Sequence, residues 1–139
     1  MQSQRPLILI VDDRPELAQA LHRTLSGLAC EVVAADSAET LAALLAQTRP
    51  QAVILDLMMP GRDGYEALPL IAAHDRAMPV LLVSGHGQSW LRMGETLGRA
   101  HGLVALQTAA KPVRREELVA FVSVVVDTFA FARSEPNRQ

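Results

Sequence analysis

Several features are scarce in this chain of 139 residues, and each scarcity excludes a class of protein. Cys30 is the only cysteine, so an internal disulfide framework is excluded, and a lone cysteine beside an apolar run is most simply a small buried side chain in a reducing compartment. No apolar run is long enough to cross a bilayer, and the N-terminus lacks the basic and apolar segments of a secretory signal. The net charge is −2, without the basic excess that favours nucleic acid. We therefore expect a cytoplasmic protein with no membrane contact and no direct contact with nucleic acid.

Lysine is also scarce, since Lys111 stands alone beside twelve arginines. It ends an apolar stretch, and three acids end two other apolar runs: Asp12 and Asp13 after residues 7–11, and Asp56 after residues 52–55. A compact ammonium group can follow a phosphoryl group, whereas the planar guanidinium is a rigid fork. The pattern predicts an anionic, metal-dependent phosphoryl site.

The rest of the chain alternates between strand-like and helix-like segments. Apolar runs predict five strands, at residues 7–11, 30–34, 52–55, 79–83 and 103–109. Helical periodicity and cap signals predict five helices, at residues 15–28, from the Asp36–Glu39 cap to a stop before Pro50, and at about 65–74, 89–100 and 114–132. Because the five strands are apolar throughout, we expect all of them to be buried on both faces, the pattern of a parallel α/β sheet covered by helices on each side. The composition, 50% hydrophobic and 20% charged, indicates one globular domain over residues 1–133, followed by a flexible tail at 134–139.

Ligands of such folds bind beyond the carboxyl ends of the strands. The predicted strands place five chemically active side chains there: Asp12, Asp13, Asp56, Ser84 and Lys111. Three carboxylates in one pocket repel each other unless a divalent cation holds them, and Mg²⁺ prefers oxygen ligands of this kind. The same ion neutralises charge on an incoming phosphoryl group. We therefore expect Mg²⁺ as the cofactor.

Four motifs occur together in this order: residues 11–13 (Val-Asp-Asp), Asp56 with the turn-rich residues 58–64, residues 83–87 (Val-Ser-Gly-His-Gly), and Lys111-Pro112. With these motifs in register, the chain resembles a response-regulator receiver domain of two-component signalling from Leu7 to about Ala132. The resemblance implies a flavodoxin-like, doubly wound (βα)5 fold in three layers, with a five-stranded parallel sheet of order 2-1-3-4-5.

The resemblance also implies a role for each site residue. Asp56 would be the phosphoacceptor, taking a phosphoryl group from a sensor histidine kinase or a phosphotransfer protein. Asp13 would bind the metal directly, Asp12 directly or through water, and Met58 through its backbone carbonyl, with Asp56 completing the metal ligands. Ser84 and Lys111 would each contact a phosphoryl oxygen, and the Lys111–Pro112 bond resembles the cis peptide of the family. The protein would then signal by altered partner binding and not as an enzyme, apart from self-phosphorylation from small donors and autodephosphorylation.

Two departures from the family pattern concern the segment before Lys111. Most receivers carry a tyrosine or phenylalanine three residues before this lysine, where the present chain has Thr108. The segment around Gly98–Leu103 is also longer than usual, which resembles receivers associated with EAL-type cyclic-di-GMP regulators. Trp90 lies near the start of the helix after the Ser84 loop, so we expect it to sense the site even though position 108 has no aromatic residue.

Other interpretations stay open at this point. The chain could be a pseudo-receiver, a protein-interaction scaffold that is never phosphorylated, or an aspartyl-phosphate phosphohydrolase, although such enzymes commonly show Asp-x-Asp after the first strand. The pair Asp12-Asp13 could be an ordinary helix cap, and Ser84 a loop cap. The four histidines show no metal-ligand spacing and are expected on the surface.

The last helix is apolar around most of its circumference. One stripe covers the sheet, formed by Leu118, Phe121, Val122, Val125 and Phe129. Four more apolar residues are left over: Val119, Val124, Val126 and Phe131. They predict a second contact, with another copy of the chain or with an output domain, unless the segment Gly98–Leu103 covers them.

Overall fold

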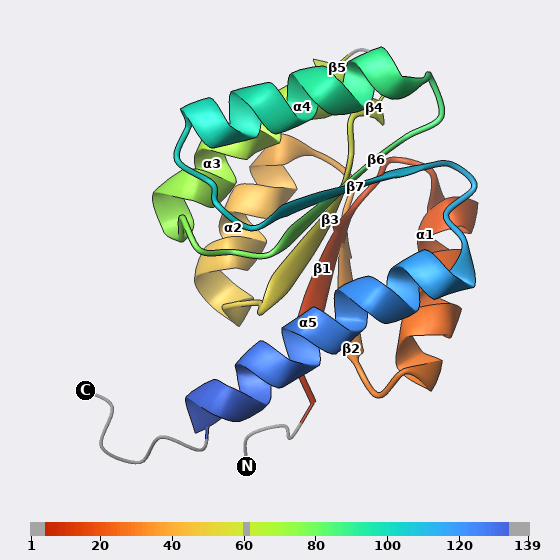
Figure 1. Ribbon diagram of the computed structural model, residues 1–139, viewed down its shortest axis with the longest axis vertical. Coiled ribbons are helices and arrows are strands. Elements are labelled where there is room, and N and C mark those ends of the chain that lie inside the picture. Colours follow the sequence, from red (N-terminus) through yellow and green to blue (C-terminus); the bar gives the residue numbers. More distant parts are fainter. Residues whose placement is uncertain (1–4, 60–61, 134–139) are drawn as a thin grey trace.

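The computed structural model describes residues 5–59 and 62–133. Five parallel strands form one sheet in the order β2-β1-β3-β6-β7 (Figure 1). Their bounds are β1 Leu7–Val11, β2 Glu31–Ala35, β3 Ala52–Asp56, β6 Val80–Ser84 and β7 Leu106–Ala110. Counted along the chain, this is the order 2-1-3-4-5, so the predicted flavodoxin-like α/β fold is confirmed. The predicted tail at 134–139 lies outside the described residues.

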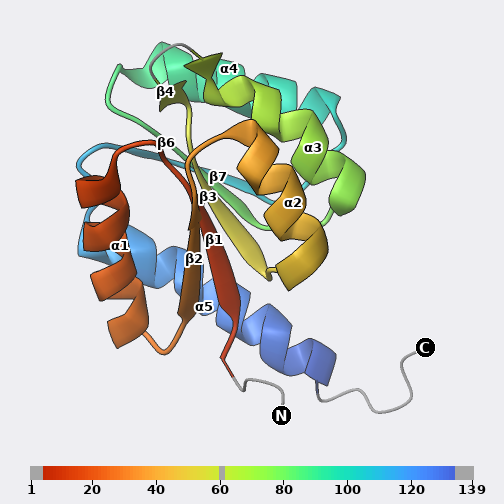
Figure 2. The ribbon, with the colours of Figure 1, turned by 180° about the vertical axis from the view of Figure 1, so that it is seen from behind.

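Helices cover both faces of the sheet, as the three-layer prediction requires (Figures 1 and 2). One layer holds α1 Pro15–Gly27 and α5 Arg115–Arg133, which share a buried cluster with the sheet around Ile10, Ile54 and Phe121. The other layer holds α2 Ala38–Thr48, α3 Ala67–His74 and α4 Gln88–Ala100, packed around Leu55, Leu68 and Leu82. The sheet therefore lies between two separate hydrophobic cores.

Burial distinguishes the three central strands from the two edge strands. β3 and β6 are buried along their whole length, and β1 is buried except at Leu7. The prediction that all five strands are buried on both faces is wrong for β2 and β7, where positions such as Glu31 and Thr108 are exposed. An edge strand has a neighbour on one side only, so an apolar sequence there does not ensure burial.

Two strand boundaries also differ from prediction. The last strand begins at Leu106 and not at 103, because Leu103 is buried from a loop and Val104 is 68% exposed. The second strand begins at Glu31, directly after Cys30. Cys30 is buried as predicted, and its burial raises the pKa of the thiol, although the Arg5 guanidinium acts in the opposite direction.

The turn-rich segment after β3 contains a small hairpin that the sequence did not predict. The two-residue strands β4 Met58–Met59 and β5 Arg62–Asp63 pair antiparallel, and a short 3₁₀ turn, Gly64–Glu66, leads into α3 (Figure 1). The Gly64 N–H donates to the carbonyl of Leu57 at 2.8 Å. A Cβ on Gly64 would overlap the carbonyl oxygen of Asp56, so only glycine permits this close return of the chain.

Helix α4 packs closely on the sheet through two glycines. A Cβ on Gly94 would stand 2.8 Å from Cδ1 of Leu57, and one on Gly98 would stand 2.8 Å from Cδ1 of Leu106. Both distances are far inside van der Waals contact, so side chains at these positions would push the helix away. The leucines of the sheet fill the space that the glycines leave.

Helix α5 follows the predicted stripe, with Phe121 and Val125 fully buried. Val119 is 38% exposed and Val124 is 46% exposed, whereas Val126 packs against the buried cluster. The segment Gly98–Leu103 does not cover these residues, because Leu103 belongs to the core on the opposite face of the sheet. The side chain of Phe131 lies outside the described residues. Among residues 5–59 and 62–133, no helix has the length and apolar character to cross a membrane.

Candidate functional site

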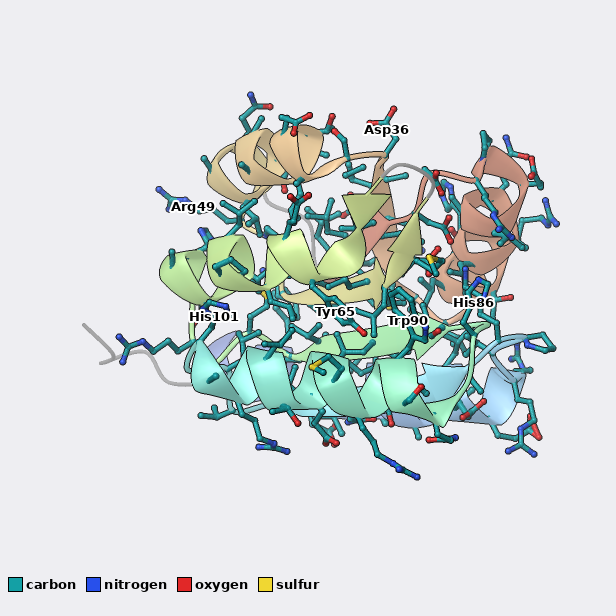
Figure 3. The ribbon with its side chains drawn as sticks, turned by 90° about the horizontal axis from the view of Figure 1, so that it is seen from above. Asp36, Arg49, Tyr65, His86, Trp90 and His101 are labelled. Atoms are coloured by element: carbon teal, nitrogen blue, oxygen red, sulfur yellow. The ribbon has the colours of Figure 1, made fainter. Side chains whose placement is uncertain are left out.

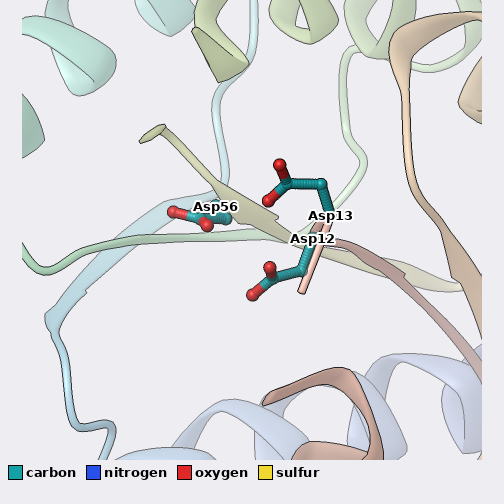
Figure 4. A group of neighbouring side chains, drawn as sticks. All are labelled: Asp12, Asp13 and Asp56. Carbon is teal, nitrogen blue, oxygen red and sulfur yellow. The ribbon is translucent and has the colours of Figure 1, made fainter. Parts of the chain in front are cut away.

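Three acids meet at the carboxyl edge of the sheet (Figure 4). Asp12 and Asp13 directly follow β1, and Asp56 is the last residue of the adjacent β3. Each offers a carboxylate oxygen within 4.8 Å of the other two. Asp12 and Asp56 are buried, at 5% and 2% exposure. The predicted clustering of these three side chains is therefore what the fold produces.

Lys111 reaches the same cluster from the end of β7. Its Nζ donates to Oδ2 of Asp56 at 3.0 Å and to Oδ2 of Asp12 at 3.3 Å. The backbone N–H of Lys111 donates to the carbonyl of Ser84 at 2.9 Å, which fixes the lysine beside the end of β6. The Lys111–Pro112 peptide is cis, as the family resemblance implied. A single ammonium thus bridges two carboxylates that come from different strands.

The remaining oxygens show which carboxylate lacks partners. Oδ1 of Asp56 accepts the N–H of Met58 at 3.1 Å, and Oδ1 of Asp12 accepts the N–H of Arg14 at 2.9 Å. Oδ1 of Asp13 is buried with no hydrogen-bond partner. Arg14 is the N-cap residue of α1 and makes no side-chain cap bond, so neither aspartate caps this helix. The interpretation of the acid pair as an ordinary helix cap is therefore wrong.

The charges of the cluster fit a divalent cation. The cluster holds three carboxyl groups and only one ammonium, and Asp13, a member of the cluster, has a buried oxygen without a partner. A buried carboxylate oxygen without a donor is costly, and a metal ion is the usual partner that removes the cost. Carboxylate oxygens are the ligands that Mg²⁺ takes. Within the described part of the chain, no other group of histidines, cysteines or acids lies close enough to hold a metal ion.

The environment of Asp56 changes its acidity. Burial raises the pKa of this carboxyl above its ordinary value, and the nearby charge of Asp12 acts in the same direction. The N–H of Met58 and the ammonium of Lys111 favour the ionised form and oppose that rise. The lysine therefore does more than position Asp56, because it also helps to keep the side chain in the form that can act as a nucleophile.

Ser84 ends β6, the strand next to β3, and its side chain is fully buried. Its Oγ accepts the backbone N–H of His86 at 3.0 Å, so the hydroxyl does turn the following loop. This bond uses a lone pair of the oxygen, and the hydroxyl keeps its proton for donation to another acceptor. Loop turning and phosphoryl contact are compatible roles for this one side chain.

Three aromatic side chains, which could not be grouped from the sequence, lie together beside Ser84 (Figure 3). The rings of Tyr65 and Trp90 stack with their centroids 5.5 Å apart and 14° between their planes. The Tyr65 hydroxyl donates to the carbonyl of Trp90 at 2.9 Å. The ring of His86 lies 6.2 Å from that of Trp90. All four histidines are exposed, as predicted. The contact of His86 with Trp90 could not be predicted from that exposure.

Comparison with known proteins identifies the family. The model of the response regulator receiver domain matches residues 8–123, and the chain belongs to this family. It is thus a receiver domain of two-component signalling, as the four motifs indicated. The further similarity to receivers of EAL-type regulators stays a prediction.

Two curated relatives that match this chain are longer proteins. It is 36% identical over 94 residues to the C4-dicarboxylate transport transcriptional regulatory protein DctD of Pseudomonas aeruginosa, covering 68% of this chain and 20% of DctD. It is 33% identical over 123 residues to the DNA-binding response regulator MtrA of Mycolicibacterium smegmatis, covering 88% of this chain and 51% of MtrA. The chain thus spans about half of MtrA and a fifth of DctD.

A solved structure supports the fold. The chemotaxis protein CheY4 of Vibrio cholerae superposes with a TM-score of 0.74 at 24% identity, covering 87% of this chain and 98% of CheY4. At this identity the similarity is evidence for the fold alone. Together with the sheet order, it establishes the flavodoxin-like receiver architecture.

Proposed function

We propose that Asp56 accepts a phosphoryl group from a sensor histidine kinase or a phosphotransfer protein, in a reaction that depends on Mg²⁺. One observation carries the proposal most: Lys111 bridges Asp56 and Asp12 while a buried oxygen of Asp13 has no partner. A scaffold that is never phosphorylated has no need for this arrangement, because unneutralised buried carboxylates destabilise a fold. The site is costly to the protein unless it binds a cation, and a bound cation is what an incoming phosphoryl group requires.

The transfer would proceed by nucleophilic displacement at phosphorus. A carboxylate oxygen of Asp56 forms a new bond to phosphorus, the bond from phosphorus to the imidazole nitrogen of the donor breaks, and that nitrogen keeps the electron pair. Lys111 pairs with one phosphoryl oxygen, and the hydroxyl of Ser84 donates to another. Mg²⁺, held by Asp12, Asp13, Asp56 and the carbonyl of Met58, would neutralise charge on the transferred group.

The output of the phosphorylated protein would be altered binding to partners. The chain would act as a signalling domain in the cytoplasm and not as an enzyme, with self-phosphorylation from small donors and autodephosphorylation as its only reactions. MtrA is a DNA-binding response regulator, but the present chain spans only half of that protein. The absence of direct nucleic-acid contact therefore stays a prediction for this chain.

Binding of beryllofluoride, a phosphoryl mimic, tests the proposal by calorimetry. Binding should require both Mg²⁺ and Asp56. Asp13→Ala is expected to weaken Mg²⁺ binding by more than about tenfold, because it removes the oxygen without another partner. Asp12→Ala should have a smaller effect, because both Asp12 oxygens already accept hydrogen bonds. Beryllofluoride that binds equally well in EDTA, or an Asp13→Ala variant with wild-type Mg²⁺ affinity, would contradict the assignment.

We also propose that the exposed valines of α5 contact a second copy of the chain or an output domain. Val124→Glu should reduce self-association in analytical ultracentrifugation and change the free energy of unfolding by less than about 0.5 kcal/mol, because this side chain is 46% exposed. Val126 is unsuitable for the test because it packs against the core. Val104→Glu, on a more exposed valine in the loop after α4, is the control. A wild-type protein that stays monomeric at high concentration would leave only the output-domain version.

A further inference from the structure

Two segments that follow different strands of the sheet contact each other at the start of α4. Tyr65 follows the hairpin after β3, and Trp90 lies in the first turn of α4, 25 residues further along the chain. A ring stack and a hydrogen bond from the Tyr65 hydroxyl to the Trp90 carbonyl connect them (Figure 3). Both residues are partly buried and pack against the core on this face of the sheet. The first turn of α4 is therefore held by these contacts to the segment that follows Asp56 in the chain.

Each end of this connection reaches a residue of the phosphoryl site. On one side, Gly64 precedes Tyr65 and lies so close to the carbonyl of Asp56 that no Cβ fits between them. On the other side, the backbone N–H of His86 donates to Oγ of Ser84, and the His86 ring lies against Trp90. A displacement at Ser84 thus passes through one residue, His86, before it reaches Trp90, and a displacement at Asp56 passes through two, Gly64 and Tyr65.

In most receivers the last strand carries an aromatic side chain three residues before the lysine, but β7 of this chain does not. Thr108 is exposed on the edge strand β7, and no aromatic residue lies between Leu97 and Lys111. Trp90, by contrast, contacts two rings near Ser84, those of Tyr65 and His86.

We propose that Tyr65, Trp90 and His86 form the switch that transmits the state of the Asp56 site to α4. The proposal rests on the phosphorylation proposed above. When the Ser84 hydroxyl turns to donate to a phosphoryl oxygen, its Oγ shifts, the His86 N–H follows this acceptor, and the His86 ring moves relative to Trp90. The hydrogen bond of Tyr65 to the Trp90 carbonyl holds α4 in its unmodified position. This bond therefore opposes the phosphorylated state.

The experiment measures beryllofluoride affinity and the fluorescence of Trp90, the only tryptophan, in the presence of Mg²⁺. The wild-type signal should change when beryllofluoride binds. Tyr65→Phe keeps the stacked ring and removes only the hydroxyl, so it should bind beryllofluoride about two- to tenfold more tightly, as expected when one hydrogen bond no longer favours the unbound state. His86→Ala should retain binding in calorimetry but lose more than half of the fluorescence change. Thr108→Ala is the control, and it should match wild type in both measurements.

The outcomes separate the switch from phosphorylation itself. Wild-type affinity in Tyr65→Phe, or a full fluorescence change in His86→Ala, would overturn the switch. So would a protein that gains a phosphoryl group from acetyl phosphate without any change at Trp90, and in that case the proposed function would stand. A protein that neither gains a phosphoryl group nor binds beryllofluoride would overturn both. A large effect of Thr108→Ala would place the transmission on β7 and contradict the aromatic route.

Discussion

Acetyl phosphate and Mg²⁺ are expected to add one phosphoryl group to the wild-type protein and none to Asp56→Asn. The physical reason is that Asp56 accepts the shorter hydrogen bond from Lys111, at 3.0 Å against 3.3 Å for Asp12, and ends the strand that pairs with the strand of Ser84. Its carboxylate is therefore the one that we expect to attack phosphorus. An amide at the same position keeps the shape of the side chain but is a poor nucleophile. Intact-mass spectrometry measures the result directly. Chelation of Mg²⁺ by EDTA should abolish the addition.

Asp36 provides a matched control for this experiment. It directly follows β2 and so lies at the same edge of the sheet, but its side chain is exposed and lies outside the acid cluster. Asp36→Asn should therefore accept the phosphoryl group as wild type does. The group should be released by hydroxylamine, as expected for an acyl phosphate. A mass that stays unchanged across several small donors, with Mg²⁺ present, would favour the scaffold interpretation.

Lys111→Ala is expected to lower the free energy of unfolding by about 3 kcal/mol at neutral pH in EDTA, the cost of breaking a buried ion pair. The variant leaves three carboxylates without their ammonium, and the pKa of Asp56 rises further because two influences that lower it are removed. A carboxyl whose pKa is higher in the folded than in the unfolded protein contributes stability at low pH, and this contribution is lost as the pH rises through the folded pKa. The deficit should therefore be largest at neutral pH and shrink in acid.

Urea denaturation at several pH values measures this effect, and Lys111→Arg separates charge from shape. The arginine keeps the positive charge, so most of the stability should return. Its planar group does not reproduce the single-point contact, so phosphorylation from acetyl phosphate should stay slow. A Lys111→Ala variant as stable as wild type at neutral pH would mean that the carboxylates are already protonated there. Full phosphorylation of Lys111→Arg would mean that the site does not require a compact ammonium group.

The acid cluster could be predicted from the sequence because it depends on one simple rule. Apolar runs locate the strands, parallel strands end at one edge, and the residues that follow the runs must meet there. Asp12, Asp13 and Asp56 satisfy this rule without any knowledge of side-chain contacts. The lysine was harder to place, since its strand was predicted to begin three residues too early, but the end of that strand was predicted within one residue.

The aromatic group could not be predicted because it depends on contacts between distant segments. Nothing in the sequence near Tyr65 indicates that it faces Trp90, and the two-residue strands that turn the chain toward it are too short to show any periodicity. His86 was correctly predicted to be exposed, yet exposure says nothing about a ring contact. The prediction that β2 and β7 are buried was wrong for a related reason. An apolar sequence does not reveal how many neighbouring strands a strand has.

The two glycines of α4 make this helix dependent on its attachment. Each glycine inside a helix disfavours helix formation by about 1 kcal/mol relative to alanine, so the isolated segment has little tendency to remain folded. Its contacts with Leu57, Leu82 and Leu106 supply what the backbone lacks, and they exist only while the helix is docked on the sheet. Undocking and local melting of α4 are therefore coupled events. A partner that gains access to the underside of α4 is therefore expected to meet a segment that has lost part of its helical form.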